Sequence, residues 1–544
     1  MTRPMDAATT DEAADVVIIG AGASGAVAAK RLSEAGMRVV CLEQGDWPDY
    51  SKARAMYDDF EVSAGSLWNY NPNTRRAPSD YPIDDSESDI SAVLWNGVGG
   101  STVQWAANWM RNLPSDFRVR SLDGVADDWP LSYADLEPYY REVERDFAVS
   151  GLGGDPAYPG TFTPPLRPMA LHRAGELVAR GHNRLGWHWW PGCNAIATEP
   201  HGALSPCVQR ATCMWGCVDR AKASTDLTHW PMLIKRGVQL VTGARVSRIP
   251  VDARGLAIGA EYIDRDGRQH LQRASVTILA ANGIGTPRIL LASGPGGRPE
   301  GLANSSGLVG RRLMMHPVAG VVGLFDEDLK TYVGPFGQIA YCLQFYETDE
   351  SRGFVRGAKW SLQPTGGPLQ AIREWPWGQA ELWGDRFHAA IATRFSHSVS
   401  WGIICEDLPD ADNRVVLDPT LTDPDGISAP KLVYKTSENS RRLLAFHVAR
   451  AQESLEAAGA QATVVAPQIR ETGWHVSGTA KMGEDPSTSV VDPWGRCHDV
   501  DNLYIVDGSI WPTSSGVNPL ATITALALRC AGHLVSTRQE QRTP

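Results

Sequence analysis

The chain has 544 residues, more than one ordinary hydrophobic core holds, so its length predicts two large domains or one interleaved pair. Hydrophobic residues make up 43% and charged residues 21%, a balance that is typical of globular proteins and excludes a disordered chain. The formal net charge is −11 and no cluster of Lys or Arg interrupts it, so we expect no nucleic-acid partner and no membrane partner.

The N-terminal segment has no basic region followed by an apolar core, so we expect no secretory signal. The longest apolar run, in PLATITALALRCAGHLV, is shorter than a membrane span and contains Arg529. Nine cysteines are few for this length and are typical of a reducing compartment. We therefore expect a cytoplasmic protein.

The first predicted elements form a β-α-β unit. Residues 16–19 are an apolar run typical of a buried parallel strand, residues 26–35 are predicted to be a helix, and residues 38–42 a second strand. The sequence GAGASG joins the first strand to the helix. A glycine-rich turn in this position is the usual frame for a dinucleotide, so the unit predicts a nucleotide-binding domain.

The turn contains the pattern G-x-G-x-x-G at Gly20, Gly22 and Gly25. The first glycine allows the tight turn, the second lets the backbone approach a pyrophosphate, and the third allows close packing of helix on strand. Free N–H groups at the start of the helix favour phosphates. Glu43 ends the second strand, where its carboxylate can accept both ribose hydroxyls, and no arginine follows it to hold a 2′-phosphate. The pattern predicts NAD or FAD and does not distinguish them.

The middle of the chain alternates between irregular and regular segments. Residues 50–95 are predicted to be irregular, residues 99–111 hold a second glycine-rich turn, and residues 130–147 predict an amphipathic helix with a good N-terminal signal. Residues 238–292 predict a strand, a hairpin, another strand and a glycine-rich turn into a helix. Alternating apolar segments in residues 330–463 predict an antiparallel sheet with flanking helices.

The C-terminal part again predicts buried strands and apolar helices, as the N-terminal part does. A long helix is predicted at residues 436–458, a buried strand in NLYIVDGS and an apolar helix at residues 519–536. This order predicts a nucleotide-binding domain built from separated segments, with a second domain inserted in it. We expect the first domain at residues 1–125, 195–325 and 465–544 and the second, substrate-binding domain at residues 126–194 and 326–464.

Two groups of residues allow more than one interpretation. Cys207, Cys213 and Cys217 would suit a metal or a disulfide, but their spacing lacks a C-x-x-C pair, so we expect loop thiols and no metal. Nineteen tryptophans include clusters at residues 187–190 and 374–378, which serve either a core or the flat face of a sugar.

Several widely separated stretches carry further signatures. They are GAGASGAVAAKRLSEAG with Glu43, NGVGGSTVQWAANWMR (96–111), VTILAANGIGTPRILLASG (276–294), GLVGRRLMMHP (307–317), HVSGTAKMG (475–483) and VVDPWGRCHDVDNLYIVDGSIWPTSSGVNPLATITALALRCA (490–531). In this order they resemble, nearly end to end, the glucose-methanol-choline (GMC) family of FAD-dependent oxidoreductases. The resemblance implies a Rossmann-like α/β FAD-binding domain of the GMC/p-hydroxybenzoate hydroxylase type and an inserted antiparallel-sheet (α+β) substrate domain.

The resemblance also implies which residues bind FAD. Asp507 and Gly508 end a strand near the flavin pyrophosphate and ribityl chain, and Asn518 and Pro519 start a helix whose N–H groups would face the pyrimidine edge of the flavin. The implied cofactor-binding set is Gly20, Gly22, Ser24, Gly25, Glu43, Gly99, Gly100, Ser101, Gln104, Asn108, Val246, Ala280, Asp507, Gly508, Asn518, Pro519 and Leu520.

His475 stands in WHVSGTAKMG, a stretch that is neither a good helix nor a good strand. Taken by itself, the stretch fits a structural imidazole at least as well as a base. By resemblance, His475 takes the hydroxyl proton of an alcohol while the carbinol hydrogen leaves as hydride for flavin N5, a role that suits a pKa near neutrality. Asn518 is its implied catalytic partner and hydrogen-bonds the substrate oxygen, and it can also cap the helix that follows.

Less specific stretches resemble the branch of the family with pyranose oxidases and glycoside 3-dehydrogenases. They are GGSTVQW (99–105), CMWGCVDRAKASTDLTHWP (213–231) and DNRVVLDP (412–419). In pyranose oxidases, a histidine bonded to the flavin precedes the tryptophan of the first stretch. Gln104 stands there in this chain, so we expect non-covalent FAD.

The expected reaction is oxidation of a secondary hydroxyl of a pyranose sugar or glycoside, at C3 rather than C2, with O2 favoured as acceptor and H2O2 as product. Polar residues of the inserted domain, such as Gln338, Gln344 and Arg373, would fix the sugar. Three alternatives stay open: a dehydrogenase of another alcohol or polyol with a separate electron acceptor, a hydroxynitrile lyase, and a non-catalytic flavin- or sugar-binding module. The presence of both His475 and Asn518 favours an enzyme.

Overall fold

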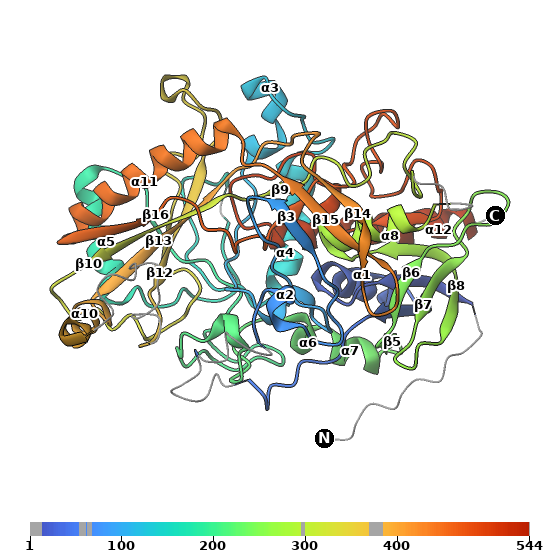
Figure 1. Ribbon diagram of the computed structural model, residues 1–544, viewed down its shortest axis with the longest axis horizontal. Coiled ribbons are helices and arrows are strands. Elements are labelled where there is room, and N and C mark those ends of the chain that lie inside the picture. The colour runs from blue at the N-terminus through green and yellow to red at the C-terminus, as the bar shows by residue number, and fades with distance from the viewer. Residues whose placement is uncertain are drawn as a thin grey trace.

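A computed structural model describes residues 13–53, 61, 68–160, 162–294, 300–368 and 384–542. Two large sheets lie at opposite ends of the molecule, a mostly parallel sheet near α1 and an antiparallel sheet near α11 (Figure 1). The predicted combination of a Rossmann-like sheet with an antiparallel sheet is therefore confirmed, while the boundaries between the two predicted domains stay a prediction.

The parallel sheet is assembled from three distant parts of the chain in the order β5-β2-β1-β8-β7-β6, with β18 also paired to β8. Its strands are β1 (Ala14–Ile19), β2 (Val39–Glu43), β5 (Gln239–Thr242), β6 (Arg245–Arg248), β7 (Gly259–Ile263), β8 (Gln269–Leu279) and β18 (Leu503–Ile505). β1 is buried on both faces, which explains why its sequence is continuously apolar instead of alternating. β8 pairs parallel with β1, whereas β7 pairs antiparallel with both β8 and β6.

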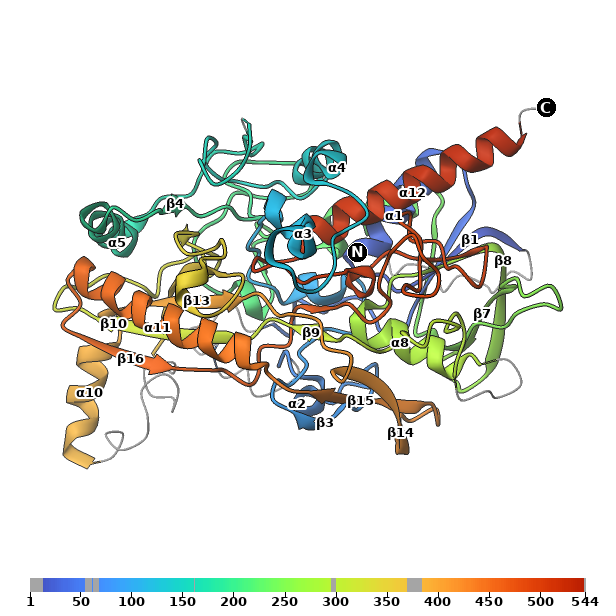
Figure 2. The same ribbon diagram turned by 90° about the horizontal axis from the view of Figure 1, so that it is seen from above.

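Helices cover this sheet. α1 (Ala23–Glu34) begins three residues before the predicted helix, because Gly22 already occupies the N-cap. α12 (Leu520–Arg542) packs against α1 and α4 (Tyr133–Asp146), as seen from above in Figure 2. α12 is long and apolar enough to cross a membrane by length and composition, but 61% of its apolar window is buried inside the fold, as in a core helix of a globular protein.

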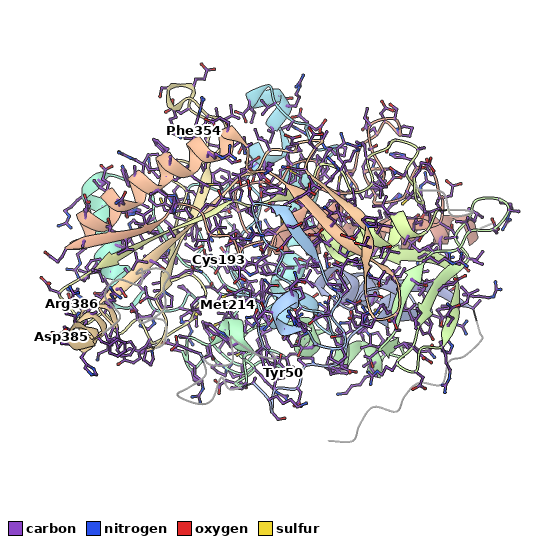
Figure 3. All side chains as sticks on the ribbon, viewed as in Figure 1. Tyr50, Cys193, Met214, Phe354, Asp385 and Arg386 are labelled. Carbon is purple, nitrogen blue, oxygen red and sulfur yellow. The ribbon has the colours of Figure 1, made fainter. Side chains whose placement is uncertain are left out.

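The antiparallel sheet has the order β16-β10-β13-β12-β11-β4. Its strands are β4 (Trp190–Pro191), β10 (Val318–Leu324), β11 (Ala340–Cys342), β12 (Ala358–Pro364), β13 (Ser398–Cys405) and β16 (Ala462–Ala466). α5 (His172–Leu185) and α11 (Glu438–Ala458) pack on one face, over Trp360 and Trp401. Phe354, labelled beside α11 in Figure 3, joins this core with its ring 5.4 Å from that of Phe446.

The other face of β12 is polar. Successive side chains of a strand point to opposite faces, so Trp360 and Leu362 enter the α11 core while Lys359, Ser361 and Gln363 point away from it. Ser361 and Gln363 line the large cavity described below. The antiparallel sheet therefore presents its polar side to that cavity.

Smaller elements complete the fold. A three-stranded sheet and a two-stranded one are formed by β3 (Asp84–Ser88), β14 (Arg414–Thr422) and β15 (Ser428–Tyr434), and by β9 (Met314–Met315) and β17 (Val476–Ser477). The short helices are α2 (Pro72–Arg75), α3 (Val119–Asp123), α6 (Thr225–Thr228), α7 (Trp230–Lys235), α8 (Asn282–Ala292) and α10 (Phe387–Arg394). The segment predicted to be irregular at residues 50–95 thus contains α2 and β3, because β15 supplies a pairing partner that no local pattern reveals.

A buried ion cluster around Arg356 joins segments that lie far apart in the sequence. The guanidinium of Arg356, at the start of β12, donates to Asp116 at 2.6 Å and to Glu406 at 2.8 Å. Tyr346 donates to Asp116 and accepts from the backbone N–H of Gly516, so the cluster also holds the loop before Asn518. Asp123 is a third carboxyl group paired with the same guanidinium. Burial raises the pKa of Asp116 to about 8 and also raises that of Glu406, although Arg356 opposes both changes.

Candidate active site

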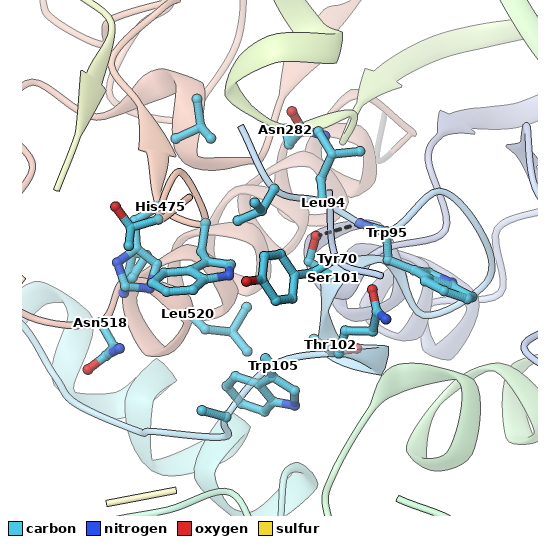
Figure 4. A pocket seen from close by; sticks show the side chains of 18 of the residues that line it. Tyr70, Leu94, Trp95, Ser101, Thr102, Trp105, Asn282, His475, Asn518 and Leu520 are labelled. Carbon is cyan, nitrogen blue, oxygen red and sulfur yellow. Dashed lines mark hydrogen bonds between the residues drawn. The ribbon is translucent and has the colours of Figure 1, made fainter. Parts of the chain in front are cut away.

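A large cavity of about 970 Å³ lies between the parallel sheet and the polar face of the antiparallel sheet. It extends from the glycine-rich turn after β1 to His475 and Asn518, which lie together on one side of Figure 4, while Trp95 and Ser101 lie on the other. The ring of Tyr70 projects between these two groups. The cavity thus connects the predicted nucleotide site with the predicted catalytic pair.

The glycine-rich turn has the close approaches that its sequence predicts. Gly20 has φ +107°, and a Cβ atom on Gly25 would lie 2.1 Å from the backbone oxygen of Gly20. A Cβ atom on Gly100, in the second glycine-rich turn, would lie 2.8 Å from Cα of Gly22. Side chains at these positions would push the two turns apart, so the glycines build a cradle of backbone at this end of the cavity.

Glu43 lies at the cavity wall with its carboxylate held by backbone donors. Its Oε2 accepts from the N–H of Ala21 and its Oε1 from the N–H of Gly45, both at 2.9 Å. Burial raises the pKa of this carboxyl, and the two backbone hydrogen bonds oppose that rise. The carboxylate is fixed beside the turn, as an acceptor for the hydroxyls of a nucleotide ribose requires.

Two buried amide oxygens at the cavity have no hydrogen-bond partner within the described residues. They are Oε1 of Gln104 and Oδ1 of Asn108, and both side chains line the cavity. The opposite ends of these amides are held, because Gln104 donates to the carbonyl of Trp68 and Asn108 to Oγ of Ser361. Buried oxygens of this kind need a donor, and the N–H and hydroxyl groups of a flavin nucleotide would satisfy them, so the cavity fits FAD.

His475 is paired with a second histidine that the sequence signatures did not single out. The pairing of β17 with β9 places His475 beside His316, with their Nδ1 atoms 2.8 Å apart. Nε2 of His316 lies 3.3 Å from the carbonyl oxygen of Ser514. A carbonyl oxygen only accepts, so Nε2 of His316 carries the proton and its Nδ1 accepts from Nδ1–H of His475. The remaining nitrogen of His475, Nε2, is left with a free lone pair.

Both histidines are held neutral. Burial, reinforced by the neighbouring His316 and Lys359, holds the pKa of His475 well below its usual 6.5. Burial lowers the pKa of His316 to about 4, although the carbonyls of Ser514 and Ser515 oppose the change. A neutral imidazole with a free lone pair at a cavity wall is prepared to accept a proton.

Asn518 lies at the start of α12 and lines the same cavity. Its Oδ1 accepts from Nζ of Lys359 at 2.8 Å. With Oδ1 engaged in this way, the amide nitrogen of Asn518 is the group free to serve as a donor.

Most of the predicted cofactor residues lie at this cavity. The lining contains Gly20, Gly22, Ser24, Glu43, Gly100, Ser101, Gln104, Asn108, Val246, Ala280, Asp507, Gly508, Asn518, Pro519 and Leu520. Gly25 and Gly99 lie behind the lining, where Gly25 packs against Gly20 and the N–H of Gly99 donates to the carbonyl of Ala21.

The expected sugar-binding role of Gln338 and Gln344 is wrong. Neither residue lines the cavity: Gln338 is buried and donates to the carbonyl of Cys193, and Gln344 accepts from the backbone N–H of His188. Both amides satisfy backbone groups inside the second domain. Arg373 and the tryptophans at 374–378 lie outside the described residues.

Several residues of the site were not predicted from the sequence. Tyr70, Trp105 and Trp474 line the cavity with aromatic rings, and Ser361, Gln363 and Ser400 line it with polar groups. His316 stands in the quoted stretch GLVGRRLMMHP, whose HP dipeptide was the available signal. Tyr70 comes from the segment predicted to be irregular, which carries no such signal.

The three clustered cysteines belong to a loop beside this region. All nine cysteines are free thiols. Among the residues that the structure describes, no three His, Cys, Asp or Glu side chains are grouped so as to hold a metal ion. Burial raises the pKa of Cys207 to about 12 and that of Cys213 to about 11.

Comparison with known proteins identifies the family. Residues 14–318 and residues 409–527 match the N-terminal and C-terminal parts of the GMC oxidoreductases, and the chain belongs to this family. Members of the family are FAD-dependent alcohol and sugar oxidoreductases, so this protein is an FAD-dependent oxidoreductase. The predicted family, fold and cofactor are thereby confirmed.

Individual relatives cover nearly the whole chain. A 2-methyl-1,2-propanediol dehydrogenase of Mycolicibacterium austroafricanum is 37% identical over 97% of this chain and 96% of its own. A 6'''-hydroxyparomomycin C oxidase of Streptomyces lividus is 32% identical over 98% of this chain and 94% of its own. The crystal structure of pyridoxine 4-oxidase from Mesorbium loti shares the fold with a TM-score of 0.65, at 18% identity over 98% of this chain and 100% of its own.

Proposed function

We propose that this protein oxidises a hydroxyl group of a pyranose sugar or glycoside to a carbonyl, with the secondary hydroxyl at C3 as first choice over C2. The observation that carries the proposal is that His475 is neutral, has a free Nε2 and lines the same side of the cavity as Asn518 (Figure 4). A hydroxyl between them would meet one acceptor and one donor, which is what loss of its proton requires.

His475 and Asn518 have different roles toward the substrate hydroxyl. Nε2 of His475 takes the hydroxyl proton, and the amide of Asn518 donates to the oxygen as negative charge grows on it. His316 keeps the proton of His475 on Nδ1 throughout, because its own Nε2–H is held by Ser514. FAD, when bound, accepts the carbinol hydrogen as hydride.

The wall opposite the cofactor turn suits a sugar. Trp474 lies at the rim beside His475, 37% exposed, with its ring 6.4 Å from that of Tyr70. Aromatic rings of this kind stack on the apolar face of a pyranose, while Ser361, Gln363 and Ser400 offer hydrogen bonds to its hydroxyls. The related diol dehydrogenase and the oxidase of a paromomycin derivative act on polyhydroxylated compounds, which supports the same substrate class.

We further propose that FAD is bound non-covalently and that O2 is the acceptor, with H2O2 as product. Gln104 stands where a covalent link would need a histidine, and an amide cannot form that link. The second candidate is a dehydrogenase that passes electrons to a separate acceptor, favoured by the name of the 37% identical relative.

The test is a panel of free sugars, glycosides and small diols, mixed with the holoenzyme under anaerobic conditions. Loss of the flavin absorption band on adding a sugar supports the proposal. No bleaching by any sugar, with bleaching by a simple diol, would replace it by a polyol dehydrogenase. A flavin that stays oxidised while a cyanohydrin is cleaved would make the protein a lyase.

Two further readouts complete this test. Peroxide release and dye reduction, measured side by side on the best substrate, separate oxidase from dehydrogenase, and analysis of the product gives the position of the new carbonyl. His475→Ala should retain FAD and ligand binding but lower kcat by about 10²- to 10⁴-fold. A binding module without catalysis would show no turnover in either protein.

A further inference from the structure

Lys359 is a buried lysine behind the catalytic pair that the proposed proton transfer does not use. It lies on β12 with its side chain on the cavity side of the sheet and is fully buried. Its Nζ lies 2.8 Å from Oδ1 of Asn518 and 2.5 Å from Oγ of Ser361. Within the described residues, no carboxylate lies close enough to form a salt bridge with it. Burying an amine without a counter-charge is costly, which makes Lys359 a candidate for a role at this site.

The hydrogen bonds around Lys359 fix how the amide of Asn518 is turned. A lysine ammonium has only donors, so the atom of Asn518 that faces it must be the carbonyl oxygen Oδ1. Nζ also donates to Oγ of Ser361, and the hydroxyl of Ser361 in turn donates to Oε1 of Gln338 at 3.5 Å. With Nζ donating to Oδ1 of Asn518, the amide nitrogen of Asn518 is turned away from Lys359.

We propose that Lys359 is a positioning residue that locks Asn518 as a hydrogen-bond donor toward the reacting hydroxyl. Without it, the amide of Asn518 can rotate and present Oδ1, an acceptor, to an oxygen that is gaining negative charge. Ser361 connects Lys359 to the second glycine-rich turn, because its Oγ also accepts from Asn108 at 3.3 Å. The inference rests on the proposed function of this site, and it deepens that function by naming the group that sets the polarity of Asn518.

Because the lock acts when charge develops on the oxygen, its loss should appear in kcat more than in KM. Lys359→Met keeps the length of the side chain and removes its donors. It should lower kcat by about 10- to 100-fold, a part of what loss of one such donor removes. KM should change less than about 3-fold. Lys431→Met is the matched control and should behave as wild type, because Lys431 is a half-buried lysine on β15 that pairs with Asp84 and Glu87 outside the cavity lining.

A double-mutant cycle with Asn518→Ala decides whether Lys359 acts through Asn518. Removing Lys359 in the Asn518→Ala background should change kcat by less than about 3-fold, because the group it positions is gone. Equal losses in both backgrounds overturn the inference, as does a change in the reduction potential of the bound flavin that is the same in both. If Lys359→Met does not fold, Lys359→Gln, which keeps a donor without a charge, takes its place and should retain most of the kcat.

The two levels of failure are distinguishable. The cycle is run with a substrate that bleaches the flavin of the wild-type holoenzyme. If no alcohol does so, the proposed function fails and this inference fails with it. If one does and the losses are equal in the two backgrounds, only the role of Lys359 fails.

Discussion

Among single residues, His475 shows how a reactive group is prepared by its neighbours. Its proton is held on Nδ1 by His316, and His316 is held in one tautomer by the carbonyl of Ser514. The acceptor nitrogen is therefore fixed by the backbone and does not depend on the substrate. A neighbouring carboxylate would have raised the pKa of His475, whereas a neutral imidazole and burial lower it.

The lowered pKa of His475 predicts the pH dependence of the reaction. The imidazole must be unprotonated to act, and its pKa lies well below 6.5, so kcat/KM for a neutral sugar should stay level as the pH falls from 8 to 6.5. An unshifted imidazole would have lost about half of its activity at pH 6.5. A pH profile of kcat/KM checks this, and an acid limb centred near 6.5 would contradict it.

At the scale of elements, the first and second glycine-rich turns are pressed together, and α1 starts from their contact. The helix brings its N-terminal N–H groups to the cavity only because Gly25 lets it approach the end of β1. The glycines of the turn therefore determine how closely α1 packs against β1.

Gly25→Ala should abolish FAD binding without unfolding the chain. The added Cβ would lie 2.1 Å from the backbone oxygen of Gly20, so α1 must move away from the turn. Gly532→Ala is the control, because that helical glycine has open space around its Cβ position and the change favours the helix. The ratio of flavin to protein absorbance measures the outcome, and a Gly25→Ala protein with full flavin would refute the prediction.

At the scale of the whole molecule, the ion cluster around Arg356 connects segments that lie far apart in the sequence. It joins Asp116 to Glu406, which directly follows β13, and through Tyr346 it reaches the loop before Asn518. The packing of these segments and the position of the loop before Asn518 therefore depend on the guanidinium of Arg356.

Arg356→Met should destabilise the protein by about 3–5 kcal/mol, because it leaves buried carboxyl groups without a partner. The raised pKa of Asp116, about 8, means that the folded protein keeps a proton that the unfolded chain releases above pH 4. Stability from this group is thus present at low pH and lost as the pH rises through 8. Arg356 opposes the rise in the pKa of Asp116, so Arg356→Met raises that pKa further, and the loss in melting temperature should widen from pH 7 to pH 9. Arg442→Met, which removes an exposed pair with Glu438, should melt like wild type at both pH values.

Much of the fold could be predicted from the sequence because its elements carry local signals. The apolar run of β1, the glycine turn and the cap of α11 at Ser437 each lie within a few residues of the element that they define. β3 was missed because its partner, β15, lies more than 300 residues away. Pairing over such distances leaves no trace in a local pattern.

The residues of the site also fall into those that the sequence predicts and those that only the structure reveals. His475 and Asn518 were predicted because each stands in a stretch that resembles the family, and the structure places both at one cavity. His316 and Lys359 act on them across strand pairs and sheet faces, which a linear sequence does not display. Gln338 was misassigned because polarity alone does not tell whether an amide faces a cavity or a buried carbonyl.

The strand order of the parallel sheet bears on the biosynthesis of the protein. β1 is made long before its neighbour β8, and β18 and α12 follow β8 only after a further long stretch of chain. The parallel sheet therefore cannot be completed before β18 has been made, and its apolar strands must stay protected until then. Loss of α12 would leave apolar surface of this part of the fold exposed and prone to aggregation.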